Sequence, residues 1–180
     1  MHRLEIGVVC HGASLDSRRA RGIKPGSLRN EKVVLNQLLS TTGNLLVKNL
    51  TGVHIDRYFA AYSHLSAGTW NRNLGYLNVF FKWCRARRYA PRDFDPLEGV
   101  NQRRVPPRDF LFIPVDRFIQ VLDSAKHPRD RALLAIGLYT FQRASEITRL
   151  TWDDVDDTHP DPRQWRIAVY REKTETRDML

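Results

Sequence analysis

The stretch Thr140–Asp156, TFQRASEITRLTWDDVD, places an arginine and a glutamate three residues apart at the head of a short amphipathic helix. Positions i and i+3 lie on the same side of a helix, so Glu146 can fix the guanidinium of Arg143. A fixed guanidinium is a permanently charged planar fork that suits bidentate contact with a phosphate. The same spacing also fits an ordinary surface ion pair, worth about 0.2–0.5 kcal/mol.

An apolar helix is expected before this stretch and a strand-rich tail after it. Residues 128–141 are apolar almost all round, which predicts a helix in the centre of a core. Residues 165–170 have a period of two that is typical of a β-strand: Trp165, Ile167 and Val169 alternate with Arg166, Ala168 and Tyr170. Residues 176–180 are expected to begin the return strand of a hairpin, with Lys173 near its turn.

The first hundred residues change pattern along the chain. Glycines and basic side chains without a sustained period open the sequence and predict a basic, poorly ordered arm. Helical periodicity follows, with Thr51 as the cap of one helix and the longest helix at 69–89. A polar, basic, double-proline segment then predicts a linker. The expected organisation is an arm at 1–27, a helical domain at 28–100, a linker at 101–112 and a second domain at 113–180.

Charge and cysteine usage narrow the class of protein. The 180 residues contain 29 Lys and Arg against 20 Asp and Glu, a net charge of +9. This excess indicates a polyanionic partner, nucleic acid before an acidic membrane surface, although a basic, unspecialised protein would look the same. Cys10 and Cys84 lie far apart without a partner pattern, which favours a reducing compartment and neither a disulfide framework nor a zinc site. No apolar run approaches the roughly 20 residues of a membrane span.

Residues 143–156 resemble the pattern Arg-x-Ser-Glu-(Leu/Ile)-x-x-Leu-x-Trp-x-Asp-(Ile/Val)-Asp, the first catalytic box of the tyrosine recombinases, or phage integrases. The resemblance implies that Arg143 holds the scissile DNA phosphate, with Glu146 in support. One departure concerns the turn before the arginine. The family usually has a glycine or another small residue there, and this chain has Phe141-Gln142.

The segment around Lys173 resembles the hairpin lysine of the same family, which follows the arginine box at about this distance. The resemblance implies that Lys173 is the general acid that protonates the 5′-oxygen leaving group. General acid catalysis contributes roughly 10²–10⁴-fold to rate. Taken without the family, the residue is a lysine in a solvated charged turn.

Residues 67–96 resemble the core-binding domain of these recombinases, a small four-helix domain that clamps DNA from the face opposite the catalytic domain. Basic side chains beside aromatic ones give this stretch a positive stripe that suits phosphate neutralisation with little base reading. A solvated charged face is the alternative. The residues expected to contact DNA are Arg72, Lys82, Arg85, Arg87, Arg88, Arg103 and Arg104.

The resemblance implies a mainly α fold with a small β-sheet at the C-terminal end: a helical, SAM-like core-binding domain followed by a truncated α+β recombinase catalytic domain. The family's remaining boxes, including the tyrosine nucleophile, are expected beyond residue 180, and none of the six tyrosines lies in the nucleophile's context. A catalytic domain cut in mid-sheet would leave apolar surface uncovered around Trp165, Ile167 and Val169.

The expected function is therefore the DNA-binding portion of a site-specific tyrosine recombinase or integrase that does not cleave DNA alone. A stand-alone DNA-binding accessory or inhibitor of a recombinase is the alternative, and a basic helical protein without a nucleic-acid role is a third. Expected partners are double-stranded DNA and a recombinase oligomer on DNA, with no membrane, metal or nucleotide cofactor. The expected location is the cytoplasm, at the nucleoid, in a prokaryotic or phage-encoded protein.

Overall fold

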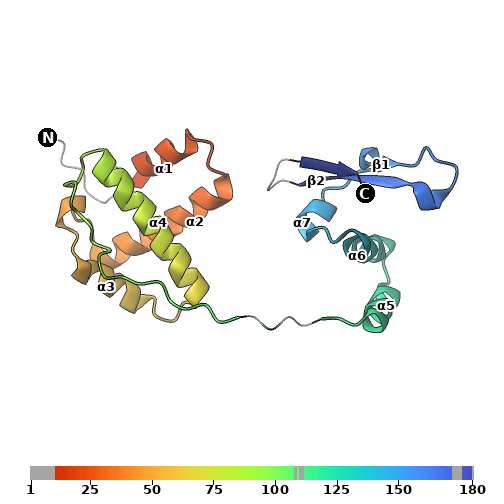
Figure 1. Ribbon diagram of the computed structural model, residues 1–180, viewed down its shortest axis with the longest axis horizontal. Coiled ribbons are helices and arrows are strands. Elements are labelled where there is room, and N and C mark those ends of the chain that lie inside the picture. Colours follow the sequence, from red (N-terminus) through yellow and green to blue (C-terminus); the bar gives the residue numbers. More distant parts are fainter. Residues whose placement is uncertain (1–10, 108, 110–111, 172–175, 180) are drawn as a thin grey trace. The chain divides into compact units, whose positions relative to one another are not determined.

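The computed structural model describes residues 11–107, 109, 112–171 and 176–179 of the chain. The chain divides into two compact units, unit 1 at residues 1–108 and unit 2 at residues 109–180. Helices predominate in both, and a small antiparallel sheet lies in the second (Figure 1). The predicted fold class, mainly α with a small sheet near the C-terminal end, is confirmed.

Unit 1 is built around a long central helix. Its elements are α1 (His11–Arg19), α2 (Pro25–Thr42), the 3₁₀ turn η2 (Val47–Asn49), α3 (Gly52–Ala61) and α4 (Ala67–Ala86). Helix α2 packs against α1, α3 and α4 (Figure 1). Thr51 is the N-cap of α3, as predicted, and its backbone N–H donates to the His54 ring at 3.2 Å. Ser66 caps α4 by accepting a hydrogen bond from the Thr69 N–H.

Helix α1 corrects the prediction of a poorly ordered arm at residues 1–27 for the part from residue 11 on, whereas residues 1–10 lie outside the described residues. Residues 11–19 are helical, and Ser14 and Leu15 are buried against the rest of unit 1. The helix also docks through an ion pair between Arg18 and the fully buried Glu31 of α2, 2.6 Å apart. Burial raises the pKa of Glu31, and the neighbouring Arg18 opposes that rise. Only one large apolar residue faces inward in these nine residues, so the sequence carries no helical period to detect.

The core of unit 1 is contiguous and rich in aromatic side chains. Its members with no exposed surface include Leu38, Ile55, Tyr58, Leu77, Phe80, Phe81 and Cys84. Burial of each large apolar side chain contributes roughly 1.5–3 kcal/mol. The Tyr58 hydroxyl accepts a hydrogen bond from Asn73 at 3.1 Å, and burial raises the pKa of Tyr58 to about 12. This core fixes the relative positions of α2, α3 and α4.

Helix α4 ends in a Schellman motif with an arginine at the left-handed position. The Tyr89 N–H donates to the Cys84 carbonyl at 2.9 Å, and the Arg88 N–H donates to the Arg85 carbonyl at 3.0 Å. Arg88 has φ 60°, where glycine is usual because a Cβ is strained there. The following segment then crosses back over the core, where Leu97 is buried.

In its described residues, unit 2 has three α-helices, two 3₁₀ turns and a three-stranded sheet. Its elements are α5 (Val115–Ser124), α6 (Pro128–Thr140), α7 (Ala144–Ile147), η3 (Trp152–Asp154), β1 (Val155–Asp156), η4 (Pro162–Gln164), β2 (Arg166–Arg171) and β3 (Thr176–Met179). The strand order is β1-β2-β3, antiparallel throughout. Val155 pairs with Ile167, and Arg171 pairs with Thr176.

One prediction about packing in unit 2 is wrong, and a second holds only in part. Helix α6 is not a buried core helix, because none of its residues is buried among the described residues, where α5 and α7 pack against it. Val169 is not uncovered: it has no exposed surface, because α7 packs against β2. Trp165, just before the strand, is 45% exposed and Ile167 is half-buried, so part of this apolar surface is uncovered as predicted. An apolar sequence such as that of α6 indicates that a helix can be buried, but it does not show which elements of the fold pack against the helix.

Helices α6 and α7 approach closely at a glycine. A Cβ on Gly137 would lie 3.3 Å from Cδ1 of Ile147, a contact that real side chains seldom make without a small shift. Ile147 is buried against α6, and Leu150 is half-buried. The close approach therefore fixes where the chain turns between the two helices.

Candidate nucleic-acid interface

The turn between α6 and α7 presents Arg143. Helix α6 ends at Thr140, and Arg143 is the N-cap of the one-turn helix α7. The carboxylate of Glu146 accepts two hydrogen bonds from Arg143, one from its backbone and one from its side chain. Oε2 of Glu146 accepts from the backbone N–H of Arg143 at 2.9 Å, and Oε1 accepts from its Nη1 at 2.8 Å. The glutamate thus caps the helix and orients the guanidinium at once.

The two partners differ sharply in exposure. The Glu146 side chain is 5% exposed, whereas the Arg143 side chain is 60% exposed. The ion pair itself adds little stability, roughly 0.2–1 kcal/mol, because water screens the exposed partner. Its effect is geometric, since a buried carboxylate holds one edge of the guanidinium and the remaining N–H donors face solvent. This arrangement is suited to binding an anion such as a phosphate.

The unusual turn before the arginine has a backbone explanation. Phe141 is the C-cap of α6 and adopts the left-handed conformation, φ 53° and ψ 27°, with its N–H bonded to the Gly137 carbonyl at 3.0 Å. A non-glycine residue costs roughly 1–2 kcal/mol there. The Phe141 ring is 87% exposed, so burial does not offset that strain. The turn has the conformation that a glycine favours, although the residue is phenylalanine.

Lys173, the predicted general acid, lies outside the described residues. It belongs to the stretch 172–175, which connects Arg171 of β2 with Thr176 of β3 in the sequence. The described part of β3 is tied back to the 3₁₀ turn η3. Arg177 donates to Asp154 at 3.2 Å. Hydrogen bonds from Thr151 hold the pKa of Asp154 below its usual value, and Arg177 adds to this effect.

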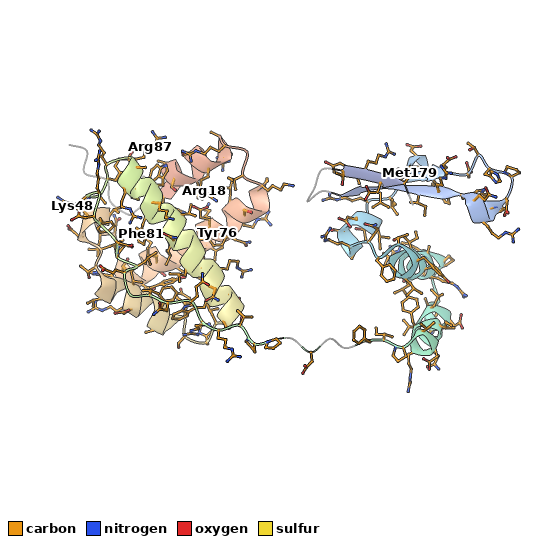
Figure 2. The ribbon with its side chains drawn as sticks, viewed as in Figure 1. Arg18, Lys48, Tyr76, Phe81, Arg87 and Met179 are labelled. Atoms are coloured by element: carbon orange, nitrogen blue, oxygen red, sulfur yellow. The ribbon has the colours of Figure 1, made fainter. Side chains whose placement is uncertain are left out.

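The basic side chains of the predicted stripe differ in direction and in partners. At about 100° per residue, Arg72 and Arg85 of α4 point roughly 140° apart, with Lys82 between them. Arg85 is also occupied: its Nη1 donates to the Phe94 carbonyl at 2.6 Å and lies 3.9 Å from Asp95. The predicted DNA contacts that are exposed are Arg72, Lys82, Arg87, Arg88 and Arg104. Arg87 follows the C-terminal end of α4, whereas Tyr76 lies near the middle of the helix (Figure 2).

Arg103 is engaged within unit 1. Its guanidinium carbon lies 3.4 Å from the centre of the Trp70 ring. Its Nη1 donates to the carbonyls of Ser63 and Leu65 at 3.3 and 3.4 Å. The side chain is thus held by groups of its own unit, which sequence reasoning did not anticipate.

Sequence reasoning also missed a polar hollow between α2 and α4, which we call the α2–α4 hollow. It has a volume of about 130 Å³, and its lining includes Asn30, Val33 and Gln37 from α2 and Thr69, Arg72 and Tyr76 from α4. Val33 is 50% exposed beside these amides. Residues at i, i+3 and i+7 share one face of a helix, so Asn30, Val33 and Gln37 could have been grouped from their spacing.

Within the described ranges, no helix has the length and apolar character of a membrane span. The same part of the chain holds no group of three or more His, Cys, Asp or Glu side chains placed to bind a metal ion.

Solved structures share this architecture. A lambda integrase(75–356) dimer bound to a COC′ core site matches with a TM-score of 0.78 and 15% identity, over 95% of this chain and 60% of that one. A lambda integrase tetramer bound to a Holliday junction matches with a TM-score of 0.80 and 14% identity, over 98% and 50% of the two chains. Lambda integrase is a tyrosine recombinase. This chain has the fold of part of a tyrosine recombinase.

The resemblance inferred from residues 143–156 is therefore confirmed at the level of the fold. The chain spans 60% or less of the length of these integrase chains. No protein-family profile matches the sequence, and no curated protein gives a significant match.

Proposed function

We propose that this chain is the DNA-binding portion of a site-specific tyrosine recombinase. The observation that carries the proposal is Arg143, an exposed arginine whose backbone and guanidinium are both held by the buried carboxylate of Glu146. An arginine oriented in this way gains little stability from its partner, which favours a role in binding an anion. The integrase-like fold and the net charge of +9 support DNA as the polyanion.

Unit 1 supplies the larger DNA contact in this proposal. The α2–α4 hollow combines Arg72 with the amides of Asn30 and Gln37, which are the side chains that pair with base edges in a major groove. The exposed Val33 can contact a thymine methyl group. The exposed arginines Arg87 and Arg88, beyond the end of α4, are suited to phosphates. Unit 1 would thus position the duplex and read part of its sequence.

These 180 residues bind DNA in this proposal without cleaving it. Arg143 can clamp a phosphate, and a covalent 3′-phosphotyrosyl bond also needs a tyrosine activated beside that phosphate. Tyr58 is fully buried and hydrogen-bonded in unit 1, and three more tyrosines belong to the same unit. Tyr139 lies on α6 and Tyr170 on β2. None stands in the sequence context of the family's nucleophile.

DNA affinity measured against salt concentration tests the binding proposal. A fluorescein-labelled duplex and a labelled four-way junction are titrated with the protein, and fluorescence anisotropy is recorded. Arg143→Ala should weaken binding and reduce the slope of log K against log salt by about 0.9, the value for one lost phosphate contact. Arg163→Ala is the matched control, because Arg163 is 90% exposed and pairs with Asp161 in a loop of the same unit. Equal effects of the two substitutions would refute the assignment of Arg143.

A nicked suicide duplex tests the absence of cleavage. In such a substrate the leaving strand diffuses away, so a covalent protein–DNA adduct accumulates and survives a denaturing gel. We expect no adduct from the 180-residue chain. An adduct that disappears in one tyrosine-to-phenylalanine variant would identify a nucleophile and overturn this part of the proposal.

A second function, a stand-alone DNA-binding accessory or inhibitor of a recombinase, is favoured by one observation. Unit 1 has a contiguous core of its own, drawn from α2, α3, α4 and the segment after α4. A cooperative thermal unfolding transition of the whole chain, together with competition against a complete recombinase for the same duplex, would favour this function. Binding to the duplex without displacement of the recombinase would count against it.

A further inference from the structure

The strongest unassigned feature is the set of contacts that holds Arg103, which we call the Arg103 clasp. It consists of Arg103 with Asn71, Trp70 and the carbonyls of Ser63 and Leu65. The Asn71 side chain binds both backbone groups of Arg103. Its Oδ1 accepts from the Arg103 N–H at 2.8 Å, and its Nδ2 donates to the Arg103 carbonyl at 2.8 Å. A residue 32 positions away in the sequence is thereby fixed to helix α4 in one register.

The guanidinium of Arg103 also contacts groups of unit 1. It stacks on Trp70 at 3.4 Å, and Trp70 in turn packs on Phe59 with ring centres 4.0 Å apart. The carbonyls of Ser63 and Leu65, which accept from its Nη1, follow the end of α3 at Ala61. A cation is favoured near the negative end of a helix. Arg103 therefore has its charge satisfied inside unit 1.

The surroundings of the clasp disfavour a phosphate. A hollow of about 530 Å³ beside it is lined by Asp56 and Glu98, together with Trp70 and Arg103 itself. Two carboxylates near the guanidinium would repel a DNA phosphate. Arg104, the next residue, is exposed, and no hydrogen bond or ion pair is seen for it among the described residues.

We propose that the clasp makes Arg103 a positioning residue, which fixes Arg104 on unit 1 so that Arg104 contacts a DNA phosphate. This inference rests on the proposed DNA-binding function. The sequence predicted a DNA contact for both Arg103 and Arg104, whereas this proposal keeps the contact for Arg104 and gives Arg103 a positioning role. In this proposal Asn71 and Trp70 hold Arg103 in place, Arg103 thereby fixes the position of the adjacent Arg104, and Arg104 contacts the DNA phosphate.

A double-mutant cycle on the whole chain tests the inference. Arg104→Ala should weaken binding to the labelled duplex and reduce the salt slope by about 0.9. Asn71→Leu has nearly the same volume and cannot pair with the Arg103 backbone, so it should weaken binding to a similar extent. In the Arg104→Ala background Asn71→Leu should have no further effect, because the contact it positions is already absent. Additive effects would overturn the proposal.

Substitutions at Arg103 separate positioning from direct contact. Lysine keeps the charge and loses the planar fork that stacks on Trp70 and spans two carbonyls. If Arg103 positions Arg104, Arg103→Lys and Arg103→Ala should weaken binding equally. If Arg103 itself contacts a phosphate, Arg103→Lys should retain most of the affinity that Arg103→Ala loses, and the proposal fails.

Trypsin cleavage without DNA separates the clasp from the DNA-binding proposal. The bond between Arg103 and Arg104 should be cut several-fold faster in Asn71→Leu than in the original chain, because cleavage requires the clasped backbone to open. Cleavage after Arg57, an exposed residue of helix α3 in the same unit, serves as the internal control for general unfolding. Unchanged cleavage after Arg103 would refute the clasp. Faster cleavage in a chain that binds neither duplex nor junction would support the clasp and refute the proposed function.

Discussion

Arg88 offers a prediction in which stability and DNA binding change in opposite directions. It occupies the left-handed position of the Schellman motif, with φ 60°. An L residue costs roughly 1–2 kcal/mol there, and glycine costs roughly 0.5–1 kcal/mol in chain entropy instead. The Arg88 side chain is exposed, so its removal uncovers no core. The variant Arg88→Gly should be more stable than Arg88→Ala by about 0.5–1 kcal/mol.

The alanine variant separates charge from strain. Both variants remove the guanidinium, and only Arg88→Gly relieves the backbone. Hydrogen exchange at core amides of α4, such as those of Leu77 and Phe81, reports the free energy of unfolding of unit 1. If Arg88 contacts a phosphate, the two variants should lose the same DNA affinity and the same increment of salt slope, about 0.9. Equal stabilities of Arg88→Gly and Arg88→Ala would refute the strain argument, and wild-type salt slopes would refute the contact.

Three further predictions concern single groups. Glu146→Ala should reduce exchange protection of the Arg143 amide by about 0.5–2 kcal/mol, the usual value of a helix cap, because the amide loses its acceptor, and unchanged protection would contradict the capping geometry. Because burial raises the pKa of Tyr58 to about 12, the folded state keeps it neutral while the unfolded chain ionises near pH 10. Stability of unit 1 should therefore be complete below pH 10 and fall by about 2–3 kcal/mol toward pH 12. Tyr58→Phe should remove this dependence in urea unfolding, at a cost of about 1–3 kcal/mol because Asn73 loses its acceptor. Gly43→Ala should destabilise unit 1 by about 1–3 kcal/mol, because φ 74° with ψ −179° is open essentially to glycine alone, and an unchanged thermal midpoint would contradict this.

Local signals in the sequence predicted much of the helical structure. Thr51 precedes α3 as its cap, and the helix predicted at 69–89 is observed as α4, Ala67–Ala86. The pairing of Arg143 with Glu146 was also predicted from spacing, although Arg143 has an extended backbone as the N-cap of α7, so the contact is that of a capping box and not of two helical residues. Such features need no knowledge of which elements meet in space.

Features that depend on tertiary contacts could not be predicted in the same way. Helix α1 docks through Arg18 and Glu31, a pair that a pattern of apolar and polar residues assigns to the surface. Arg85 and Arg103 resemble their basic neighbours in sequence, yet both are occupied by carbonyls of segments that the fold brings beside them. Charge counts identify a basic protein, and only the partners of each arginine indicate which ones are available to a ligand.

The close approach at Gly137 has a consequence for protein engineering. The position of the Arg143 turn depends on a glycine in the preceding helix, which touches neither the arginine nor the glutamate. A designer who grafts residues 141–150 onto another helical scaffold must therefore also transfer the glycine that lets Ile147 settle against α6. In a saturation library of the chain, position 137 should tolerate fewer residues than its half-buried surroundings suggest.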